Sequence, residues 1–279
     1  MGIPSIVDTI LKEYIALFNE HLPKTLEGLY IHGSIALNAY VDDSSDIDFI
    51  TITNRSLTEK DSESLSYIHS IIAKKYKKPE MDGVYILRED LGKLYTHTHD
   101  YNYNYPFYNN EILRFGDYFN FNPITWWILK KKGVSIIGGI HPKDFQFEIQ
   151  PQELLSYVLG NMNTYWVNRI QMIENSFGDF VELPTDEIDI EIEWSVLGLL
   201  RQFYTLKEND IVSKLDAGEY GLNQLPVEWY NIIKESMNIR NGVKSKIFNS
   251  DMERMDATLR FSKFLITHCN NIVKENLSY

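Results

Sequence analysis

Two aspartates, Asp46 and Asp48, stand one residue apart at the start of an apolar, β-branched segment, IDFITI (47–52). Side chains two positions apart on a strand project from the same face, so the two carboxylates are expected to lie together. Two like charges that are close and partly buried repel each other and lose hydration, and a divalent cation relieves both effects. Carboxylates combined with substrate phosphates are the usual environment of Mg²⁺. The spacing therefore predicts a Mg²⁺ site formed by Asp46 and Asp48.

A candidate phosphate site lies upstream, where a short β-rich segment ends at Gly33 and Ser34 follows. A strand that ends in Gly and leads into a helical turn leaves backbone N–H groups free, and Gly lets a phosphate approach the backbone closely. Ser45, directly before the first aspartate, offers a second hydroxyl. The pattern thus predicts a phosphate cradle made by Gly33, Ser34 and Ser45 beside the metal site.

The order and spacing of these motifs resemble those of the nucleotidyltransferase superfamily, whose members are polymerase β-like. The matching residues are Gly33 and Ser34, the interval from Ser34 to Ser45, and the sequence DIDF that begins at Asp46. The resemblance implies that the two aspartates hold Mg²⁺ and that Gly33 and Ser34 hold the triphosphate of a nucleotide.

Most of the chain resembles one family in that superfamily, the aminoglycoside 3''- and 9-adenylyltransferases, which are streptomycin and spectinomycin resistance enzymes. Three segments carry the likeness: LLRQFYTLKENDIVSKLDAGEYGLNQLP (199–226), NNEILRFGDYF (109–119) and NPITWWILKKKGVSIIGG (122–139). The first resembles part of the family's helical domain, the second the segment with its catalytic glutamate, and the third the helix and strand that follow. The family implies ATP as co-substrate, Mg²⁺ as cofactor and a cationic antibiotic as acceptor.

Transfer of a nucleotidyl group to a hydroxyl requires a group that takes the hydroxyl proton. In the segment that resembles the family's catalytic stretch, Glu111 is the candidate base. Asp82, directly before a predicted strand, is a rival third carboxylate, and we expect it to be either a further metal ligand or the base. The sequence leaves these two assignments open.

The resemblance also points to three cations in the second half of the chain. Arg201 and Lys214 match positions at which the family's helical domain reaches the nucleotide phosphates. Basic residues suit that role because guanidinium and ammonium groups form charge-assisted hydrogen bonds with phosphate. Arg240 falls where the family has a tyrosine at the nucleotide. We therefore expect Arg201, Lys214 and Arg240 to contact ATP.

The acceptor side is predicted from the acidic segment TDEIDIEIEW (185–194). Acidic side chains attract a polycationic aminoglycoside, although they also suit the N-terminus of a helix. In the family an acidic residue here contacts the drug, and Glu191 matches it, whereas Trp194 stands where the family often has a histidine. Streptomycin-accepting members use a tryptophan upstream, yet no tryptophan lies between Trp166 and Trp194. The resemblance therefore favours spectinomycin over streptomycin.

The elements that position these residues are predicted from apolar periodicity. Helical spacing covers residues 5–21 and 61–77, and short β-rich runs end at Gly33 and cover 47–52 and 83–87, whereas the polar, tyrosine-rich stretch 96–110 predicts a loop. After about residue 150 the pattern is helical, with predicted helices in 151–177, 191–206, 227–239 and 250–273. The periodicity therefore predicts a part with strands and helices up to about residue 150 and an all-helical part after it. The resemblance implies an α+β fold class: a nucleotidyltransferase domain with a small mixed sheet at 1–150, then an all-α helical substrate-binding domain at 151–279.

Composition narrows the classes of partner and compartment. The 279 residues carry a net charge of −12, which argues against binding a long polynucleotide, because such proteins normally present a basic surface. The sequence has one cysteine, Cys269, and no apolar run of the roughly 18 residues that a membrane span requires. Its N-terminus lacks the pattern of a signal peptide. We expect a monomer in the cytoplasm, with no membrane partner.

Together these features predict Mg²⁺-dependent transfer of AMP from ATP to a hydroxyl of an aminoglycoside or aminocyclitol, with release of pyrophosphate. Two alternatives stay open. One is a nucleotidyltransferase with another acceptor, such as a lincosamide or a protein hydroxyl. The other is a degenerate, non-catalytic nucleotidyltransferase that only binds a partner, against which the intact Asp46, Asp48 and Ser34 argue.

Overall fold

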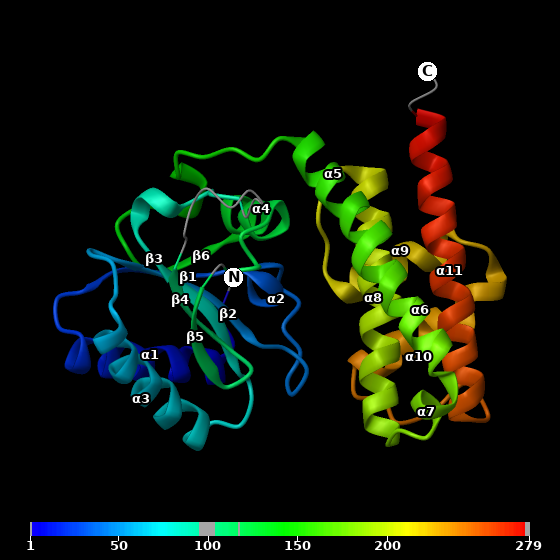
Figure 1. Ribbon diagram of the computed structural model, residues 1–279, viewed down its shortest axis with the longest axis horizontal. Helices are drawn as coiled ribbons and strands as arrows, with labels where there is room; N and C mark the ends of the chain where they lie inside the picture. The colour runs from blue at the N-terminus through cyan, green and yellow to red at the C-terminus, as the bar shows by residue number, and fades with distance from the viewer. Residues whose placement is uncertain (1, 95–103, 117, 277–279) are drawn as a thin grey trace. The chain divides into compact units, whose positions relative to one another are not determined.

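The computed structural model describes residues 2–94, 104–116 and 118–276 (Figure 1). The chain divides into two compact units, Met1–Ile149 and Gln150–Tyr279. The first unit combines a sheet with helices, and every described element of the second unit is helical. The predicted fold class, an α+β domain with a small mixed sheet followed by an all-helical domain, is therefore confirmed.

The first unit is built on a mixed sheet with the strand order β5-β4-β3-β2-β1-β6. Its strands are β1 (Leu26–Ile31), β2 (Ile47–Thr53), β3 (Met81–Ile86), β4 (Tyr105–Asn109), β5 (Ile112–Gly116) and β6 (Val134–Ile137). Neighbours β2 and β3 run parallel, whereas the other pairs are antiparallel. The parallel pair is possible because α3 (Glu59–Lys75) makes the crossover between the two strands.

Each face of the sheet has its own apolar core, since side chains alternate along the strands. Ile47 and Phe49 of β2 pack in the cluster that includes the buried residues of α1 (Ser5–His21) and α3. Ile50 and Ile52 pack on the opposite face, with Trp126 of α4 (Pro123–Lys132). Asp48 shares the face of Ile50 and therefore belongs to the α4 side of the sheet.

The local predictions for this unit agree with the structure except in one stretch. The helix predicted at 5–21 is α1, and the strand predicted at 47–52 is β2. The loop predicted at 96–110 is wrong for Tyr105–Asn109, which forms β4 because it pairs with both β3 and β5. Residues 95–103 of that stretch lie outside the described residues.

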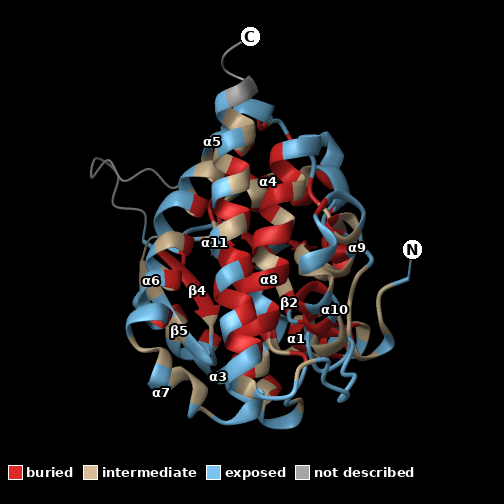
Figure 2. Ribbon diagram, turned by 90° about the vertical axis from the view of Figure 1, so that its right-hand side faces the viewer, coloured by how far each residue is buried: buried red, intermediate tan, exposed pale blue. Residues whose placement is uncertain are grey.

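The second unit is a bundle around α8, a 24-residue helix. Figure 2 shows the buried positions of α8 facing its neighbours. Around it lie α5 (Pro151–Asn161), a π-helical turn (Met162–Trp166), α6 (Val167–Asn175), α7 (Phe177–Val181), α9 (Lys214–Gln224), α10 (Tyr230–Arg240) and α11 (Asp251–Asn276); α8 itself spans Thr185–Glu208. Among the described helices, none has the length and apolarity to cross a membrane.

Candidate active site

Asp48 and Asp82 are the centre of the site. They occupy equivalent positions on the parallel strands β2 and β3, where Asp48 is the register partner of Asp82. Neighbouring strands lie about 4.8 Å apart, and partners in register project from the same face, so the two carboxylates lie side by side. Asp46 directly precedes β2 and is exposed. The structure thus places Asp48 and Asp82 side by side, with the exposed Asp46 two residues before Asp48.

The environment of Asp82 favours its neutral form. Burial raises the pKa of Asp82 to about 6, a hydrogen bond from Asn109 opposes that rise, and the negative charge of Asp46 adds to it. The Asn109 amide donates to Asp82 Oδ2 at 2.5 Å, and the Tyr118 hydroxyl lies 3.4 Å from Asp82 Oδ1. A carboxyl group whose pKa lies near neutral pH is suited to accept a proton during a reaction.

Asn109 and Tyr118 are site residues that the sequence prediction missed. Both lie in the segment 109–119, which was singled out for Glu111. Asn109 ends β4 beside Asp82, and Tyr118 is buried with Phe121 and Trp126 on the α4 side of the sheet. The resemblance of that segment was the available signal, but only the strand pairing shows which of its side chains reach the carboxylates.

Gly33 packs directly against the Asp48 carboxylate. The residue begins the short helix α2 (Gly33–Ala36) with φ at +61°, a conformation that favours glycine. A Cβ placed there would lie 1.8 Å from Asp48 Oδ2. The backbone N–H of His32 donates to the Asp48 carbonyl at 3.0 Å, which ties the two segments together. Glycine is therefore required at position 33 by both conformation and space.

Two buried polar atoms beside Gly33 lack hydrogen-bond partners among the described residues. They are Ser34 Oγ and His32 Nε2. Burial lowers the pKa of His32 to about 4, so its imidazole is neutral at pH 7. Because an unsatisfied buried donor is costly, such atoms are suited to a ligand that supplies acceptors. Ser34 therefore fits the predicted contact with a phosphate oxygen.

Ser45 closes the turn that leads into Asp46 and β2. It is buried, and its Oγ accepts a hydrogen bond from the Val41 backbone N–H at 3.0 Å. This bond closes the turn that precedes β2. Ser45 therefore holds the loop as a hydrogen-bond acceptor, and its predicted contact with phosphate stays a prediction.

The carboxylates suit a hard divalent cation. Asp46, Asp48 and Asp82 offer oxygen donors and repel one another, and Mg²⁺ is commonly bound by one or two carboxylates together with substrate phosphates. Within the described ranges, no three His, Cys, Asp or Glu residues are already arranged as a complete ligand set. The site therefore fits a cation whose remaining ligands come from a bound nucleotide and water.

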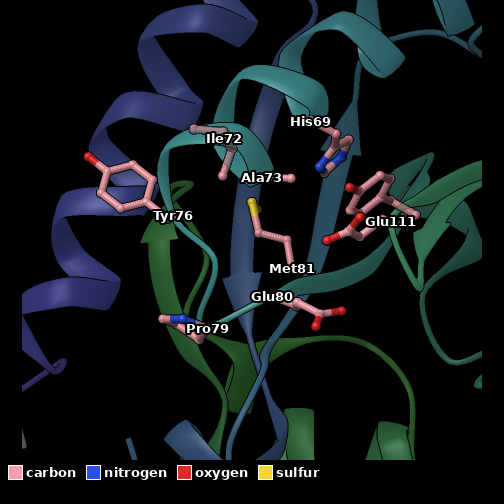
Figure 3. A pocket seen from close by; sticks show the side chains of 9 residues that line it. His69, Ile72, Ala73, Tyr76, Pro79, Glu80, Met81 and Glu111 are labelled. Carbon is pink, nitrogen blue, oxygen red and sulfur yellow. The ribbon is translucent and has the colours of Figure 1, made fainter. Parts of the chain in front are cut away.

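Glu111 does not join these carboxylates. Asn110 and Glu111 form the tight turn between β4 and β5, both with positive φ, and Glu111 is exposed. Figure 3 shows Glu111 beside a pocket that is also lined by His69, Met81 and Tyr108. Met81 and Tyr108 pack on the α1 and α3 side of the sheet, the opposite face from Asp48. The geometry thus argues against Glu111 as the base and for the alternative, Asp82.

Two of the predicted cations of the second unit pair with one carboxylate, Glu193, and the third acts on this pair through its charge. Lys214 Nζ lies 2.9 Å from Glu193 Oε2, and Arg240 Nη1 lies 3.4 Å from Glu193 Oε1. Arg201 Nε donates to the Val212 carbonyl at 3.0 Å, and the charges of Arg240 and Arg201 both act on Lys214. Three cations with one acid form a positive cluster in a chain of net charge −12, which suits an anionic ligand.

The predicted acceptor residues, Glu191 and Trp194, meet at Arg169. Glu191 is buried, forms an ion pair with Arg169, and accepts a hydrogen bond from Ser195 Oγ at 2.6 Å. The Arg169 guanidinium lies 5.0 Å from the centre of the Trp194 ring. Trp194 is 37% exposed and packs against Trp166. Glu191 is therefore paired within the bundle, whereas Trp194 keeps part of its side chain exposed.

The fold and the paired carboxylates define the class of protein as an α+β domain with a candidate cation and phosphate site, followed by a helical bundle. Residues 166–263 match the family model for the C-terminal domain of aminoglycoside adenylyltransferases. The crystal structure of spectinomycin adenyltransferase AAD(9) from Enterococcus faecialis with ATP and spectinomycin is similar in fold, with a TM-score of 0.63 and 16% identity, over 93% of this chain and 99% of that chain. No curated protein sequence matches significantly. The resemblance to the aminoglycoside adenylyltransferase family is thus confirmed.

Proposed function

We propose that this chain transfers AMP from ATP to a hydroxyl of an aminocyclitol or aminoglycoside antibiotic in a Mg²⁺-dependent reaction. The observation that carries the proposal is the pairing of Asp48 with Asp82 on adjacent strands, directly against Gly33. The family match of residues 166–263 supports an antibiotic as the acceptor. Because the proposed co-substrate is ATP, we place the reaction in the cytoplasm. We also propose that the enzyme acts as a monomer.

Asp46 and Asp48 are the proposed metal ligands, and Ser34 with the backbone at Gly33 is the proposed phosphate contact. Mg²⁺, when bound, neutralises charge on the triphosphate and on the carboxylates. The Ser34 hydroxyl, which has no hydrogen-bond partner among the described residues, donates to a phosphate oxygen. These contacts hold the triphosphate so that the α-phosphorus faces the acceptor hydroxyl.

Asp82 is the proposed general base. Its carboxylate takes the proton of the acceptor hydroxyl while the hydroxyl oxygen forms a bond to the α-phosphorus and the bond to pyrophosphate breaks. Asn109 and Tyr118 orient Asp82 for this step. Burial in the site raises the pKa of Asp82 to about 6, which supports a role in proton transfer near neutral pH.

Arg201, Lys214 and Arg240 are the proposed phosphate contacts from the helical unit. Their clustering around a single carboxylate supports this assignment, since the cluster retains positive charge after Glu193 is counted. Arginine and lysine both form charge-assisted hydrogen bonds with phosphate oxygens.

The exposed aromatic side chains of the helical unit are the proposed acceptor surface. Trp194 and Tyr165 are partly exposed and pack edge to face, with Arg169 over Trp194 and Glu191 behind it. We propose spectinomycin as a better acceptor than streptomycin. Streptomycin-accepting members of the family use a tryptophan upstream of the acidic segment, and here no tryptophan lies between Trp166 and Trp194. The acidic residues Asp186 and Glu187 at the start of α8 attract cationic drugs.

The test is pyrophosphate release from ATP and Mg²⁺ with a panel of antibiotics that includes spectinomycin, streptomycin and a lincosamide. We expect release to depend on the drug, to be fastest with spectinomycin, and to be lost in Asp48→Asn. A faster reaction with streptomycin would overturn the drug preference. Release with none of the antibiotics, from a protein that binds ATP, would contradict the proposed acceptor class.

A further inference from the structure

Glu193 links three helices of the second unit through its carboxylate. It lies on α8, whereas Lys214 is the first residue of α9 and Arg240 the last residue of α10. Glu193 is 8% exposed, and its two oxygens face the Lys214 ammonium at 2.9 Å and the Arg240 guanidinium at 3.4 Å. A buried carboxylate with two cations at these distances controls where both are held.

The surroundings of Lys214 are unfavourable to its charge except for Glu193. The charges of Arg201 and Glu193 on α8 and of Arg240 on α10 change the pKa of Lys214. On α9 itself, Asp216 accepts a hydrogen bond from the Ser213 hydroxyl at 2.7 Å and is exposed. Burial lowers the pKa of Lys214, the charge of Glu193 opposes that effect, and the charges of Arg240 and Arg201 lower it further.

We propose that Glu193 is a positioning residue that keeps the Lys214 ammonium protonated and oriented for the phosphates of the nucleotide. The inference rests on the proposed function, since it takes the cation cluster as part of the ATP site. Without Glu193, Lys214 would be a partly buried amine exposed to the charges of Arg240 and Arg201, which favour the neutral form. ATP binding would then depend on a proton that the native protein retains.

The test is the affinity for ATP with Mg²⁺, measured by calorimetry from pH 6.5 to pH 9 in the wild type and in Glu193→Gln. We compare the ratio of the two dissociation constants at each pH, because the effect of protonation of ATP itself is the same for both proteins and cancels in this ratio. At pH 6.5 we expect the variant to differ least from the wild type, because an amine keeps its proton most firmly at the low end of this pH range. At pH 9 we expect it to bind about tenfold more weakly, because one charge-assisted hydrogen bond is lost.

A second substitution separates the charge of Lys214 from other effects of Glu193. In Glu193→Gln with Lys214→Arg, position 214 stays charged throughout this pH range, so the rise in the dissociation constant should disappear. Glu208→Gln is the matched control, because it makes the same change at the last residue of the same helix. There Glu208 accepts a hydrogen bond from the Tyr220 hydroxyl at the protein surface. This variant should behave as the wild type.

The direct readout is the titration of the Lys214 side chain by NMR, which needs no nucleotide. A wild type that fails to bind ATP would count against the proposed function, whereas the NMR shift on Glu193→Gln would still test the role of Glu193. The inference is overturned if the Lys214 signal titrates identically with and without Glu193. Where Glu193→Gln unfolds, Glu193→Asp keeps the charge and should keep Lys214 protonated, and a depressed titration in that folded variant would also overturn the inference.

Discussion

Gly33 and Asp48 are in contact although they belong to different elements, and the contact leaves no room for a side chain at position 33. Replacing Gly33 by alanine places a methyl group where Asp48 Oδ2 lies and requires a residue with a side chain at φ +61°. The backbone conformation alone costs about 1 to 2 kcal/mol for an L-residue. The larger effect is expected on Asp48, whose carboxylate must move away from the metal and phosphate site.

We therefore predict that Gly33→Ala lowers kcat by about 100-fold, since a displacement of about 1 Å in a reacting geometry has effects of that size. The free energy of unfolding should fall by only about 1 to 2 kcal/mol. Pyrophosphate release and urea unfolding measure the two quantities. Gly139→Ala is the control, because nothing lies within 4 Å of its added Cβ. Equal activity of Gly33→Ala and Gly139→Ala would contradict the proposed site.

The assignment of the base is tested by a pair of isosteric substitutions. Asp82→Asn should lower kcat by about 10² to 10⁴ with little change in ATP affinity, because the proton acceptor is lost while its shape remains. Glu111→Gln should stay near the wild-type rate, because Glu111 lies at a hairpin turn and lines a pocket on the other face of the sheet.

Two outcomes would change these roles. If Glu111→Gln loses the rate and Asp82→Asn keeps it, Glu111 is the base as its segment first suggested. If Asp82→Asn weakens the response to Mg²⁺ and the binding of ATP together, Asp82 is a metal ligand. Steady-state kinetics at several Mg²⁺ concentrations, with calorimetry of ATP binding, distinguish the two.

At the scale of elements, the helical bundle is held by a buried arginine. Arg254 of α11 is 1% exposed and pairs with Glu235 of α10 at 2.7 Å, with Asp251 at 2.8 Å, and with Asp189 of α8. A buried cation is tolerated because its donors are matched by carboxylates. This network joins the same helices, α8 and α10, that carry Glu193 and Arg240.

Asp251, at the start of α11, makes the stability of the bundle depend on pH. Burial would raise its pKa, but hydrogen bonds from Lys246, Arg254 and Thr185 hold the pKa at about 2, below the ordinary value of 3.8. The folded state therefore binds the proton more weakly than the unfolded state. The ionised carboxylate stabilises the fold above about pH 4, and this contribution is lost as the pH falls from about 4 to about 2.

We predict that Asp251→Asn lowers the free energy of unfolding by about 2 kcal/mol at pH 7 and by progressively less below pH 4. Urea unfolding at pH 7, 5, 4 and 3 measures this difference. Asp256→Asn, which removes an exposed carboxylate of the same helix that pairs with Arg260, should change the stability by less than about 0.5 kcal/mol at every pH. A constant difference between Asp251→Asn and wild type across the series would exclude the proposed linkage.

At the scale of the whole molecule, the net charge of −12 opposes the binding of a nucleotide triphosphate. Mg²⁺ and the cluster of Arg201, Lys214 and Arg240 are the proposed compensation. We predict that ATP binds at least about tenfold more weakly in EDTA than in Mg²⁺, and that Lys214→Ala weakens binding by a similar factor, as expected for loss of one charge-assisted hydrogen bond.

Lys207→Ala is the matched control for that prediction, because it removes an exposed lysine from α8 and changes the net charge equally. Calorimetry should therefore separate the local contact from the change in overall charge. Similar weakening by Lys207→Ala and Lys214→Ala would mean that net charge, rather than a contact of Lys214, governs ATP binding. Equal affinity in EDTA and in Mg²⁺ would contradict the metal assignment.

Features that lie within one short segment could be predicted from the amino-acid sequence, because their spacing follows from local backbone geometry. The helix at 5–21 follows from its apolar period, and the side of β2 that bears Asp48 follows from alternation along a strand. The Gly33–Ser34 and Asp46–Asp48 motifs likewise lie within short segments. Because these motifs are short and continuous in the sequence, they can be compared with those of a known family without the structure. That resemblance was enough to predict the class of fold.

Contacts between residues far apart in the chain became apparent from the packed fold. Asp82 stands beside Asp48 because β2 and β3 pair in parallel, and β4 forms from a polar stretch because it has partners on both sides. The pairing of β3 with β4 also places Asn109 within hydrogen-bond distance of Asp82, whereas Glu111 lies in the turn after β4. Glu193 meets Lys214 and Arg240 through the packing of three helices. Such contacts depend on register and burial between segments far apart in the chain, which local periodicity does not encode.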